Sequence, residues 1–362
     1  MTLIQLGLQD FRLFGEVSFA PDPGGTTVIT GPNGTGKTTL LEAVAYLGTQ
    51  RSFRGAPRDV LVRAGADRAI VRAQLVRDEL PVLVECEIGA QGRARTQVNR
   101  QLVRSRRGLA DAAPTTVFSP EDLVVVQGGP GPRRELLDDA LAVVDRQAAT
   151  RIDEVERALR QRAALLRQAG GRLGPEVELS LEVWDDRLDA AGTALVEARE
   201  SLLDALAPLV SRRYQRLAAA GRAGAEQRDH SVTMRYVRSW SGGLGEALRA
   251  ARPDDVRRAV STVGPHRDDL AIALDGRDTR HQASQGEQRS MAIALRLAVH
   301  ELVTAVRGRP PILLLDDVFS ELDPARSRAL VELLPAGQAL VTTASPLPPG
   351  VEVGAVVVAG EL

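Results

Sequence analysis

The chain has 362 residues, 44% of them hydrophobic, so it is long enough to bury a sizeable core in two or three domains. Its 46 basic and 47 acidic side chains nearly cancel, which excludes a protein that binds nucleic acid or membranes through its overall charge. The single cysteine, Cys86, excludes a disulfide within the chain and a zinc cluster of cysteines, and it fits a reducing cytosol.

The first hundred residues predict short strands separated by Gly, Pro or Asp. The strands are expected at residues 3–11, 26–30, 69–76 and 80–89, and as a hairpin that turns near Asn99 at residues 96–103. Residues 1–11 alternate between apolar and polar side chains, without a basic leader or a long apolar run. We therefore expect neither a signal peptide nor a membrane span, and a cytoplasmic protein without a membrane partner.

A phosphate-binding loop is predicted after the strand at 26–30. The sequence GPNGTGKT matches the pattern G-x-x-x-x-G-K-[ST], and a helix with apolar spacing follows at 38–48. The glycines let backbone N–H groups converge on the phosphates of a nucleotide, Lys37 reaches the β and γ oxygens, and Thr38 offers its hydroxyl to Mg²⁺. The residues assigned to the nucleotide here are Gly31, Pro32, Asn33, Gly34, Thr35, Gly36, Lys37, Thr38 and Thr39.

Lys37 is the only lysine of the chain, and every other basic residue is arginine. A composition that has replaced lysine everywhere else indicates that this position needs a compact point charge, which a planar guanidinium does not supply. The lone lysine therefore supports a catalytic role for Lys37 independently of the motif.

Six arginines and no acid occupy residues 92–108, on and after the expected hairpin. They are Arg93, Arg95, Arg100, Arg104, Arg106 and Arg107. On a hairpin they would form a face that binds the DNA backbone without reading its sequence, and a solvated basic hairpin is the alternative. No aromatic residues are interleaved with them, so stacking on single-stranded bases is not indicated.

From Arg133 onward the spacing of apolar residues becomes helical. We expect one long helical pattern that closes at Gly170 and Gly171, and a second from about 179 to 220 in which Pro208 causes a kink or a break. Strand-like alternation returns near 266–276. The layout is therefore α/β, helical insert, α/β, with residues 133–259 inserted between 1–132 and 260–362.

A second helix N-terminus is predicted at Ser284, where the sequence SQGEQ opens an apolar helical face. A hydroxyl and a close-approach glycine at such a terminus can face an anion. The simpler reading is a surface helix that a capping box formed by Ser284 and Glu287 stabilises. The residues concerned are Ser284, Gln285, Gly286, Glu287 and Gln288.

A buried strand with a magnesium carboxylate at its end is expected at 312–317, where four apolar residues precede Asp316 and Asp317. We assign Asp316 to the metal, together with Thr38, and Asp317 to orienting the attacking water or accepting its proton. An ordinary strand followed by an acidic turn is the alternative. The segment SELDP follows, in which Asp323 is also a good N-cap for a helix that begins at Pro324.

The turn at Ser284–Gln288 resembles the signature motif of ATP-binding-cassette ATPases, in the variant SQGEQ. Further stretches resemble the RecF family of that superfamily, which is related to SMC proteins, and they occur in its order and spacing. These stretches are LGLQDFRLF, the phosphate loop, FSPEDLVVVQGGPGPRRELLD, GPHRDDL, SQGEQRSMAIAL and LLLDDVFSELD. The resemblance covers essentially the whole chain and is weakest in the helical insert.

The resemblance implies an ATPase head of ATP-binding-cassette type, with a mixed sheet and an N-terminal antiparallel β subdomain, carrying an inserted helical arm. It implies ATP and Mg²⁺ as cofactors, an ATP-dependent homodimer that binds DNA, slow hydrolysis, and recombinase loading at gaps with RecO and RecR. The signature turn and Asp323 would then contact the opposite subunit. Arg12 is expected beside the nucleotide, and Arg54 near the nucleotide or the DNA.

Two alternatives stay open at this point. The chain could be the ATPase subunit of a transporter, although Thr342 and Thr343 stand near the place where transporter cassettes carry a switch histidine. It could also be a divergent SMC-like paralogue. A long-arm SMC tether is excluded, because the insert is too short for a long heptad coiled coil and lacks a cysteine pair for a zinc hook.

Overall fold

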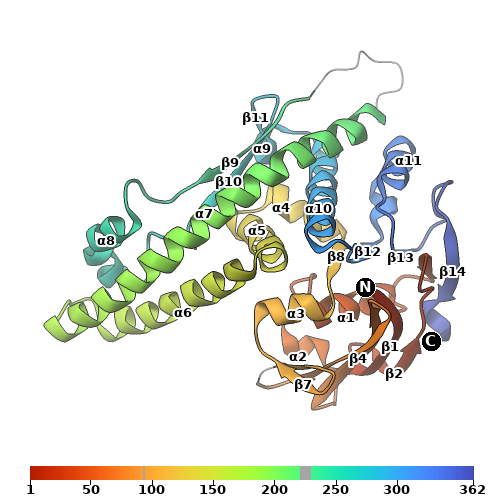
Figure 1. The fold of residues 1–362 in the computed structure, drawn as a ribbon, viewed down its shortest axis with the longest axis horizontal. Coiled ribbons are helices and arrows are strands. Elements are labelled where there is room, and N and C mark those ends of the chain that lie inside the picture. The colour runs from red at the N-terminus through yellow and green to blue at the C-terminus, as the bar shows by residue number, and fades with distance from the viewer. Residues whose placement is uncertain (93, 221–229) are drawn as a thin grey trace. The chain divides into compact units, whose positions relative to one another are not determined.

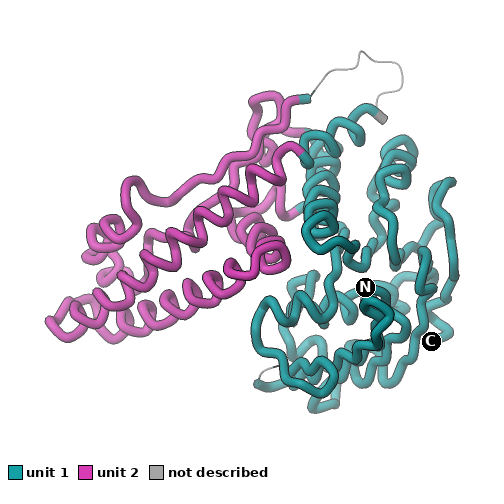
Figure 2. The backbone as a smooth tube through the Cα atoms, viewed as in Figure 1, with its two compact units in different colours: residues 1–123, 209–230, 284–362 teal, residues 124–208, 231–283 magenta. Residues whose placement is uncertain are grey.

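The computed structural model describes residues 1–92, 94–220 and 230–362, and its helices and strands are labelled in Figure 1. The chain divides into two compact units, which Figure 2 distinguishes by colour. Unit 1 comprises residues 1–123, 209–230 and 284–362, and unit 2 comprises residues 124–208 and 231–283. None of the described helices is both long enough and apolar enough to span a membrane.

The first sheet of unit 1 is antiparallel and has six strands in the order β2-β1-β4-β5-β6-β7. Their bounds are β1 (Thr2–Phe11), β2 (Phe14–Phe19), β4 (Arg68–Arg77), β5 (Leu80–Gly89), β6 (Arg95–Val98) and β7 (Gln101–Val103). In β4 the residues at every second position are buried, so Ala69, Val71 and Ala73 are fully buried on one face. The residues between them are exposed or half-buried.

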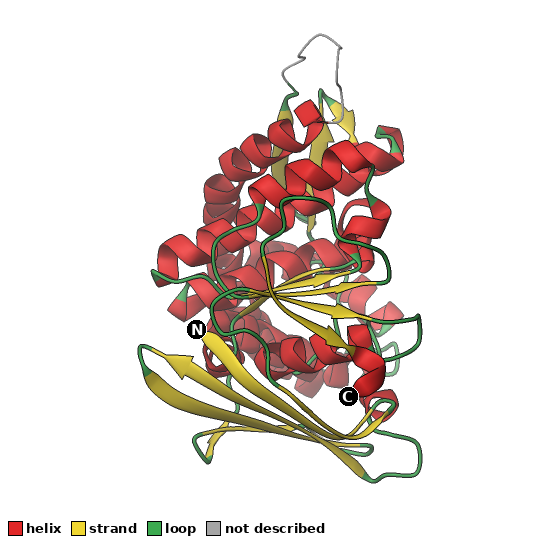
Figure 3. Cartoon of the chain, turned by 90° about the vertical axis from the view of Figure 1, so that its right-hand side faces the viewer, coloured by secondary structure: helices red, strands yellow, loops and turns green. Residues whose placement is uncertain are grey.

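The second sheet of unit 1 has five strands in the order β14-β3-β13-β12-β8, and all four pairings are parallel. Its strands are β3 (Thr26–Thr30), β8 (Thr115–Phe118), β12 (Ile312–Asp316), β13 (Ala339–Thr343) and β14 (Val353–Val358). Figure 3 shows the two sheets as separate layers. Because the strands of this sheet are parallel, their carboxyl ends meet at one edge, where ligands bind in such folds.

Helix α1 (Lys37–Thr49) contacts strands of both sheets. Eleven of its residues are buried, and Leu40, Leu41 and Ala43 belong to the hydrophobic cluster that joins the two sheets. A helix that is apolar on all sides is stable only inside a core, so its position is fixed from both faces. The other helices of this unit are α2 (Arg58–Leu61), α3 (Arg106–Ala112), α10 (Gln285–Arg307) and α11 (Pro324–Leu333).

Unit 2 is mostly helical and carries one small antiparallel sheet, β11-β10-β9. Its helices are α5 (Pro130–Val144), α6 (Arg146–Gln168), α8 (Leu244–Arg258) and α9 (Thr279–Gln282), and its strands are β9 (Val232–Val237), β10 (Asp269–Leu274) and β11 (Arg277–Asp278). The short α4 (Leu123–Gln127) and the long α7 (Pro175–Ala220) each have residues in both units. Within unit 2, the fully buried Arg162 pairs with Asp185 and Asp255 and thereby ties α6, α7 and α8 together.

The predicted fold class is confirmed: the chain is α/β with an antiparallel sheet, a parallel sheet and a helical region. Two details of the helical region differ from the prediction. The pattern from Arg133 to Gly170 is two helices, because Asp145 ends α5 and its carboxylate caps α6 by accepting a hydrogen bond from the N–H of Gln147. Helix α7 continues through Pro208 without a break.

The compact units divide the chain at other positions than the predicted domains do. Residues 209–230 lie in unit 1 and residues 260–283 in unit 2, whereas the prediction placed the whole of 133–259 in the arm and 260–362 in the head. The division into an ATPase head and an arm stays a prediction about function.

Candidate nucleotide site

The loop between β3 and α1 is closed around the ammonium group of Lys37. The Lys37 Nζ donates hydrogen bonds to the carbonyl oxygens of Gly31 at 2.6 Å and of Pro32 at 3.0 Å, and the side chain is largely buried. Gly36 has φ of 100°, and a Cβ on it would lie 2.4 Å from the ring of Phe14. Gly36 is therefore required both by its left-handed backbone and by the close ring.

The phosphate loop and β12 are connected at Asp316, whose carboxylate accepts hydrogen bonds from two threonine hydroxyl groups. Thr38 Oγ1 donates to Asp316 Oδ1 at 2.8 Å, and Thr342 Oγ1 donates to the same oxygen at 2.7 Å. Burial raises the pKa of the Asp316 carboxyl, while the hydrogen bonds from Thr342 and Thr38 act to lower it. A hydroxyl and a carboxylate at this separation are the oxygen ligands that Mg²⁺ prefers, so the residues fit that metal.

Asp317 follows the strand in a left-handed conformation, with φ of 49°. Its backbone N–H donates to Thr342 Oγ1 at 3.0 Å, and its carbonyl oxygen accepts from the Ser320 hydroxyl at 2.8 Å. The Asp317 Oδ1 atom is buried and has no hydrogen-bond partner among the described residues. A carboxylate oxygen in that state is an acceptor in need of a donor, such as a water molecule.

The buried carboxylate of Glu42 binds the Arg12 side chain directly and is linked through Ser52 to the backbone of Arg54. Glu42, on α1, is fully buried and accepts hydrogen bonds from Arg12 Nε at 2.9 Å and Arg12 Nη2 at 2.7 Å. The Ser52 hydroxyl also donates to Glu42 and accepts from the backbone N–H of Arg54 at 3.1 Å. The helix that begins with Lys37 thus also positions Arg12 and the start of the Arg54 loop.

The turn at Ser284 is the N-terminus of α10, as predicted. Ser284 and Glu287 form a capping box: the Ser284 side chain accepts from the N–H of Glu287, and the Glu287 carboxylate accepts from the N–H of Ser284. Ser284 and Gln285 are exposed, and Gln288 is buried. Asp323 caps α11 by accepting from the N–H groups of Ala325 and Arg326, again as predicted.

The arginines of residues 92–108 do not all lie on the hairpin. Arg95 is in β6 opposite Glu87, and Arg100 is at the tip, where both Asn99 and Arg100 have positive φ. Arg104, Arg106 and Arg107 lie after β7, with the last two in α3, and Arg107 pairs with Asp111 at 3.3 Å. Arg93 lies outside the described residues. The hairpin ends at Val103, as expected, and the role of these arginines in binding DNA stays a prediction.

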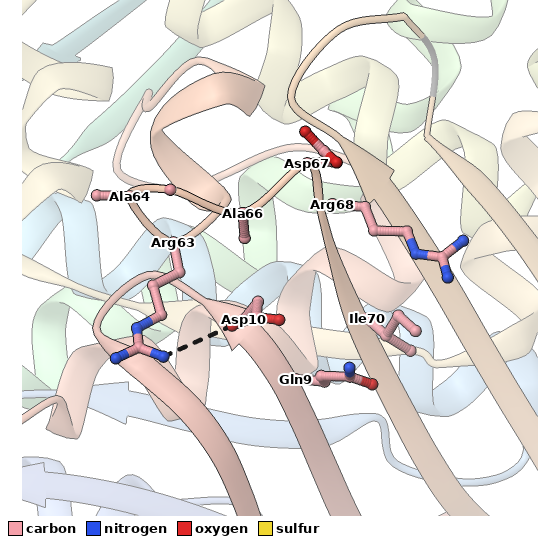
Figure 4. Close-up of a pocket in the computed structure, with 9 residues that line it drawn as sticks. Gln9, Asp10, Arg63, Ala64, Ala66, Asp67, Arg68 and Ile70 are labelled. Carbon is pink, nitrogen blue, oxygen red and sulfur yellow. Dashed lines mark ion pairs between the residues drawn. The ribbon is translucent and has the colours of Figure 1, made fainter.

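An open pocket of about 410 Å³ lies on the antiparallel sheet, between β1, β4 and the loop that carries Arg63 (Figure 4). Arg63 and Asp10 form an ion pair across it, with 3.7 Å between Nη1 and Oδ1. None of residues 31–39 lines this pocket, so it is separate from the phosphate loop.

Comparison with known proteins agrees with this geometry. A family model described as the RecF/RecN/SMC N terminal domain matches residues 2–346. A curated protein of Frankia alni, named DNA replication and repair protein RecF, is 42% identical over 95% of this chain and 93% of its own length. The protein of the same name from Streptomyces avermitilis is 40% identical over 95% of this chain and 94% of its own length. The chain belongs to the RecF family.

Solved structures give the same result for this RecF-family chain. A structure described as the recombination mediator protein RecF-ATPrS in the RecFOR pathway has a TM-score of 0.85 and 27% identity, and covers 99% of this chain and 96% of that one. An Smc head bound to the C-winged helix domain of ScpA has a TM-score of 0.53 and 16% identity over 96% of this chain and 90% of that one, which shows a shared fold only.

Several residues of the site were not found by sequence reasoning. Glu42 was missed because its partner Arg12 lies 30 positions away, and Ser52 was missed because it is linked to Arg12 only through Glu42, with no sequence pattern that connects them. Phe14 was missed because its contact with Gly36 crosses from one sheet to the loop. For Thr342, the sequence showed only that a histidine is absent, and the structure shows that its hydroxyl contacts both Asp316 and Asp317.

Proposed function

We propose that this RecF-family chain is an ATP-dependent DNA-binding protein of recombinational repair and replication, which acts in the cytoplasm and uses weak ATP hydrolysis as a switch. The observation that carries the proposal is the hydrogen bond between Thr38 and Asp316, residues 278 positions apart. It joins a phosphate loop to a carboxylate that can hold Mg²⁺. Similarity to RecF structures described as complexes with ATP and ATPrS supports ATP as the nucleotide.

In this proposal the residues of the phosphate loop and of the two acids have separate roles in phosphoryl transfer. Lys37 and the backbone N–H groups of the loop hold the β and γ phosphates, and Thr38 and Asp316 hold Mg²⁺, which neutralises charge on the phosphates when it is bound. Asp317 orients the attacking water or accepts its proton through Oδ1, the oxygen that has no partner among the described residues. Thr342 contacts both acids in different ways. Its hydroxyl donates to the Asp316 carboxylate and accepts from the backbone N–H of Asp317, so the Asp317 carboxylate is not engaged by Thr342.

In this proposal ATP joins two copies of the chain. The Ser284–Gln288 turn of one protomer contacts the γ-phosphate held by the other, Asp323 contacts the opposite protomer, and hydrolysis releases the pair. Arg54 and the arginines of residues 92–108 would then grip the DNA backbone without reading its sequence. Similarity to a recombination mediator of the RecFOR pathway supports RecO and RecR as partners in loading recombinase at gaps.

A fluorescence titration of duplex DNA tests this proposal. We expect at least about tenfold tighter binding with a non-hydrolysable ATP analogue than with ADP, and an affinity that falls steeply with salt. The double variant Arg100→Ala/Arg104→Ala should bind more weakly and lower the salt slope, whereas Arg72→Ala, whose guanidinium pairs with Glu85, should not. Equal affinity with ATP and ADP would contradict the proposal.

A further inference from the structure

The guanidinium group of Arg326 lies across the signature turn. Arg326 is the third residue of α11, yet a Cβ built on Gly286 of α10 would lie 2.9 Å from Arg326 Nη1 and 3.2 Å from Nη2. A side chain at position 286 would therefore push the Arg326 guanidinium away from the turn. With glycine at this position, a cation of the same chain lies against the turn in the free protomer.

Asp323 holds this cation with only one of its two carboxylate oxygens. Oδ1 accepts from the N–H groups of Ala325 at 3.0 Å and Arg326 at 2.9 Å, and so caps α11. Oδ2 accepts from Arg326 Nη1 at 2.7 Å, in an ion pair whose two side chains are 27% and 41% exposed. The guanidinium can thus exchange Asp323 for another anion while the cap of the helix stays intact.

The donors of the Arg326 guanidinium are incompletely paired. The Nε atom is buried and has no acceptor among the described residues, while the side chain as a whole is partly open to solvent. Arg289, one turn into α10, differs because it is bound to the side chain and the backbone of Glu321. Arg326 lies against the turn at Gly286, and its ion-pair partner is the carboxylate of Asp323.

We propose that Arg326 is a phosphate-binding residue that acts in trans: its guanidinium leaves Asp323 and donates to the γ-phosphate of ATP held by Lys37 of a second copy of this chain. This proposal rests on the proposed function. An arginine suits the task because its fork donates two parallel charge-assisted hydrogen bonds to phosphate oxygens. Loss of one such contact at each of the two sites should weaken the ATP-bound dimer by at least about tenfold.

The first experiment compares Arg326→Ala, Arg326→Lys and Arg328→Ala with the wild type. Arg328 is exposed on the same helix and serves as the matched control. We expect all four proteins to bind a fluorescent ATP analogue equally at concentrations where they are monomers. Light scattering with ATP should show normal dimerisation of Arg328→Ala, at least tenfold weaker dimerisation of Arg326→Ala, and an intermediate value for Arg326→Lys.

A mixing experiment separates a role in trans from a structural role within one protomer. A mixed dimer of Lys37→Ala and Arg326→Ala has one site with both residues intact, because Lys37 and Arg326 of that site come from different copies. We expect each variant alone to dimerise more weakly with ATP than the equimolar mixture does. If Arg326 acted only within its own protomer, both sites of the mixed dimer would be defective and mixing would restore nothing.

The outcomes distinguish this proposal from the one on which it rests. If the wild type does not dimerise with ATP, the proposed function fails. If the wild type and Arg326→Ala dimerise equally, or if the mixture dimerises no better than each variant alone, the proposed function stands and the role of Arg326 is refuted. Thermal unfolding of each variant shows whether a loss of dimers reflects a loss of fold.

Discussion

At the scale of single residues, Lys37 shows why one position keeps a lysine in an arginine-rich chain. Its ammonium is a single nitrogen that donates to two carbonyl oxygens of its own loop, and only 8% of the residue is exposed. A guanidinium is wider and planar, so it would not fit between these oxygens without opening the loop. The structure gives a steric reason for what the composition indicated.

We predict that Lys37→Arg weakens ATP binding by about tenfold or more, because the fork displaces the loop although the charge is kept. A titration with a fluorescent ATP analogue measures this. Arg328→Lys, the reverse exchange at an exposed position, is the control and should bind normally. Wild-type affinity of Lys37→Arg would mean that the loop tolerates the larger group.

The sequence predicted a contact between two residues only where each of them belongs to a recognisable motif. Thr38 and Asp316 were paired in advance because a phosphate loop and an acid after a buried strand are recognisable separately. Glu42 and Arg12 were not, since a glutamate inside an apolar helix has no pattern of its own. The partner of Gly286 was expected to be an anion, and in the free protomer it is the guanidinium of Arg326.

At the scale of elements, α1 organises the site through Glu42. We predict that Glu42→Gln lowers the free energy of unfolding by about 3 kcal/mol, because it leaves the Arg12 charge without its carboxylate in a largely buried place. Urea denaturation measures the change. Glu85→Gln, which breaks the exposed pair with Arg72, should cost less than about 1 kcal/mol. Similar losses in both variants would refute the prediction.

Helix α10 carries a second testable feature, the buried His300. Its Nδ1 lies 3.0 Å from Thr116 Oγ1 on β8, and burial lowers its pKa from 6.5 to about 4. Between these two values the unfolded chain binds more protons than the folded one, so stability falls as the pH falls from about 6.5 to about 4. Above pH 6.5 the histidine is neutral in both states and has no effect.

We therefore predict that His300→Gln loses less stability than the wild type when the pH is lowered from 7 to 5. Urea denaturation of both proteins at the two pH values provides the comparison. Replacement of His281, which is exposed, by Gln should leave the wild-type pH dependence unchanged. An equal loss in the wild type and His300→Gln would show that His300 does not contribute to this dependence.

Helices and strands were predictable where a regular pattern of apolar residues ended at a residue that interrupts secondary structure, such as glycine. The strand at 26–30 was placed correctly because Gly31 ends it, and the helix after the loop differs by one residue at each end. The break at Asp145 was missed because the residues on both sides keep one apolar face. Helix α7 runs through Pro208 because Leu206 and Val210 are buried, and their packing outweighs the lost hydrogen bond.

At the scale of the whole molecule, the chain has two compact units, and every predicted nucleotide residue lies in unit 1. These residues come from both ends of the sequence, because β3 and β12 belong to one parallel sheet that is completed only after the chain has passed through unit 2. With nearly balanced charge, the DNA binding that we propose would have to come from a local surface, which two joined copies would double.

The central claim is that ATP joins two copies of the chain, and light scattering of Asp317→Asn tests it most directly. This variant keeps the geometry around Thr342 but weakens the acceptor for the attacking water, so hydrolysis should slow by about a hundredfold. We predict twice the monomer mass with ATP and Mg²⁺, and the monomer mass with ADP. A monomer with ATP, or a dimer regardless of nucleotide, would contradict the account.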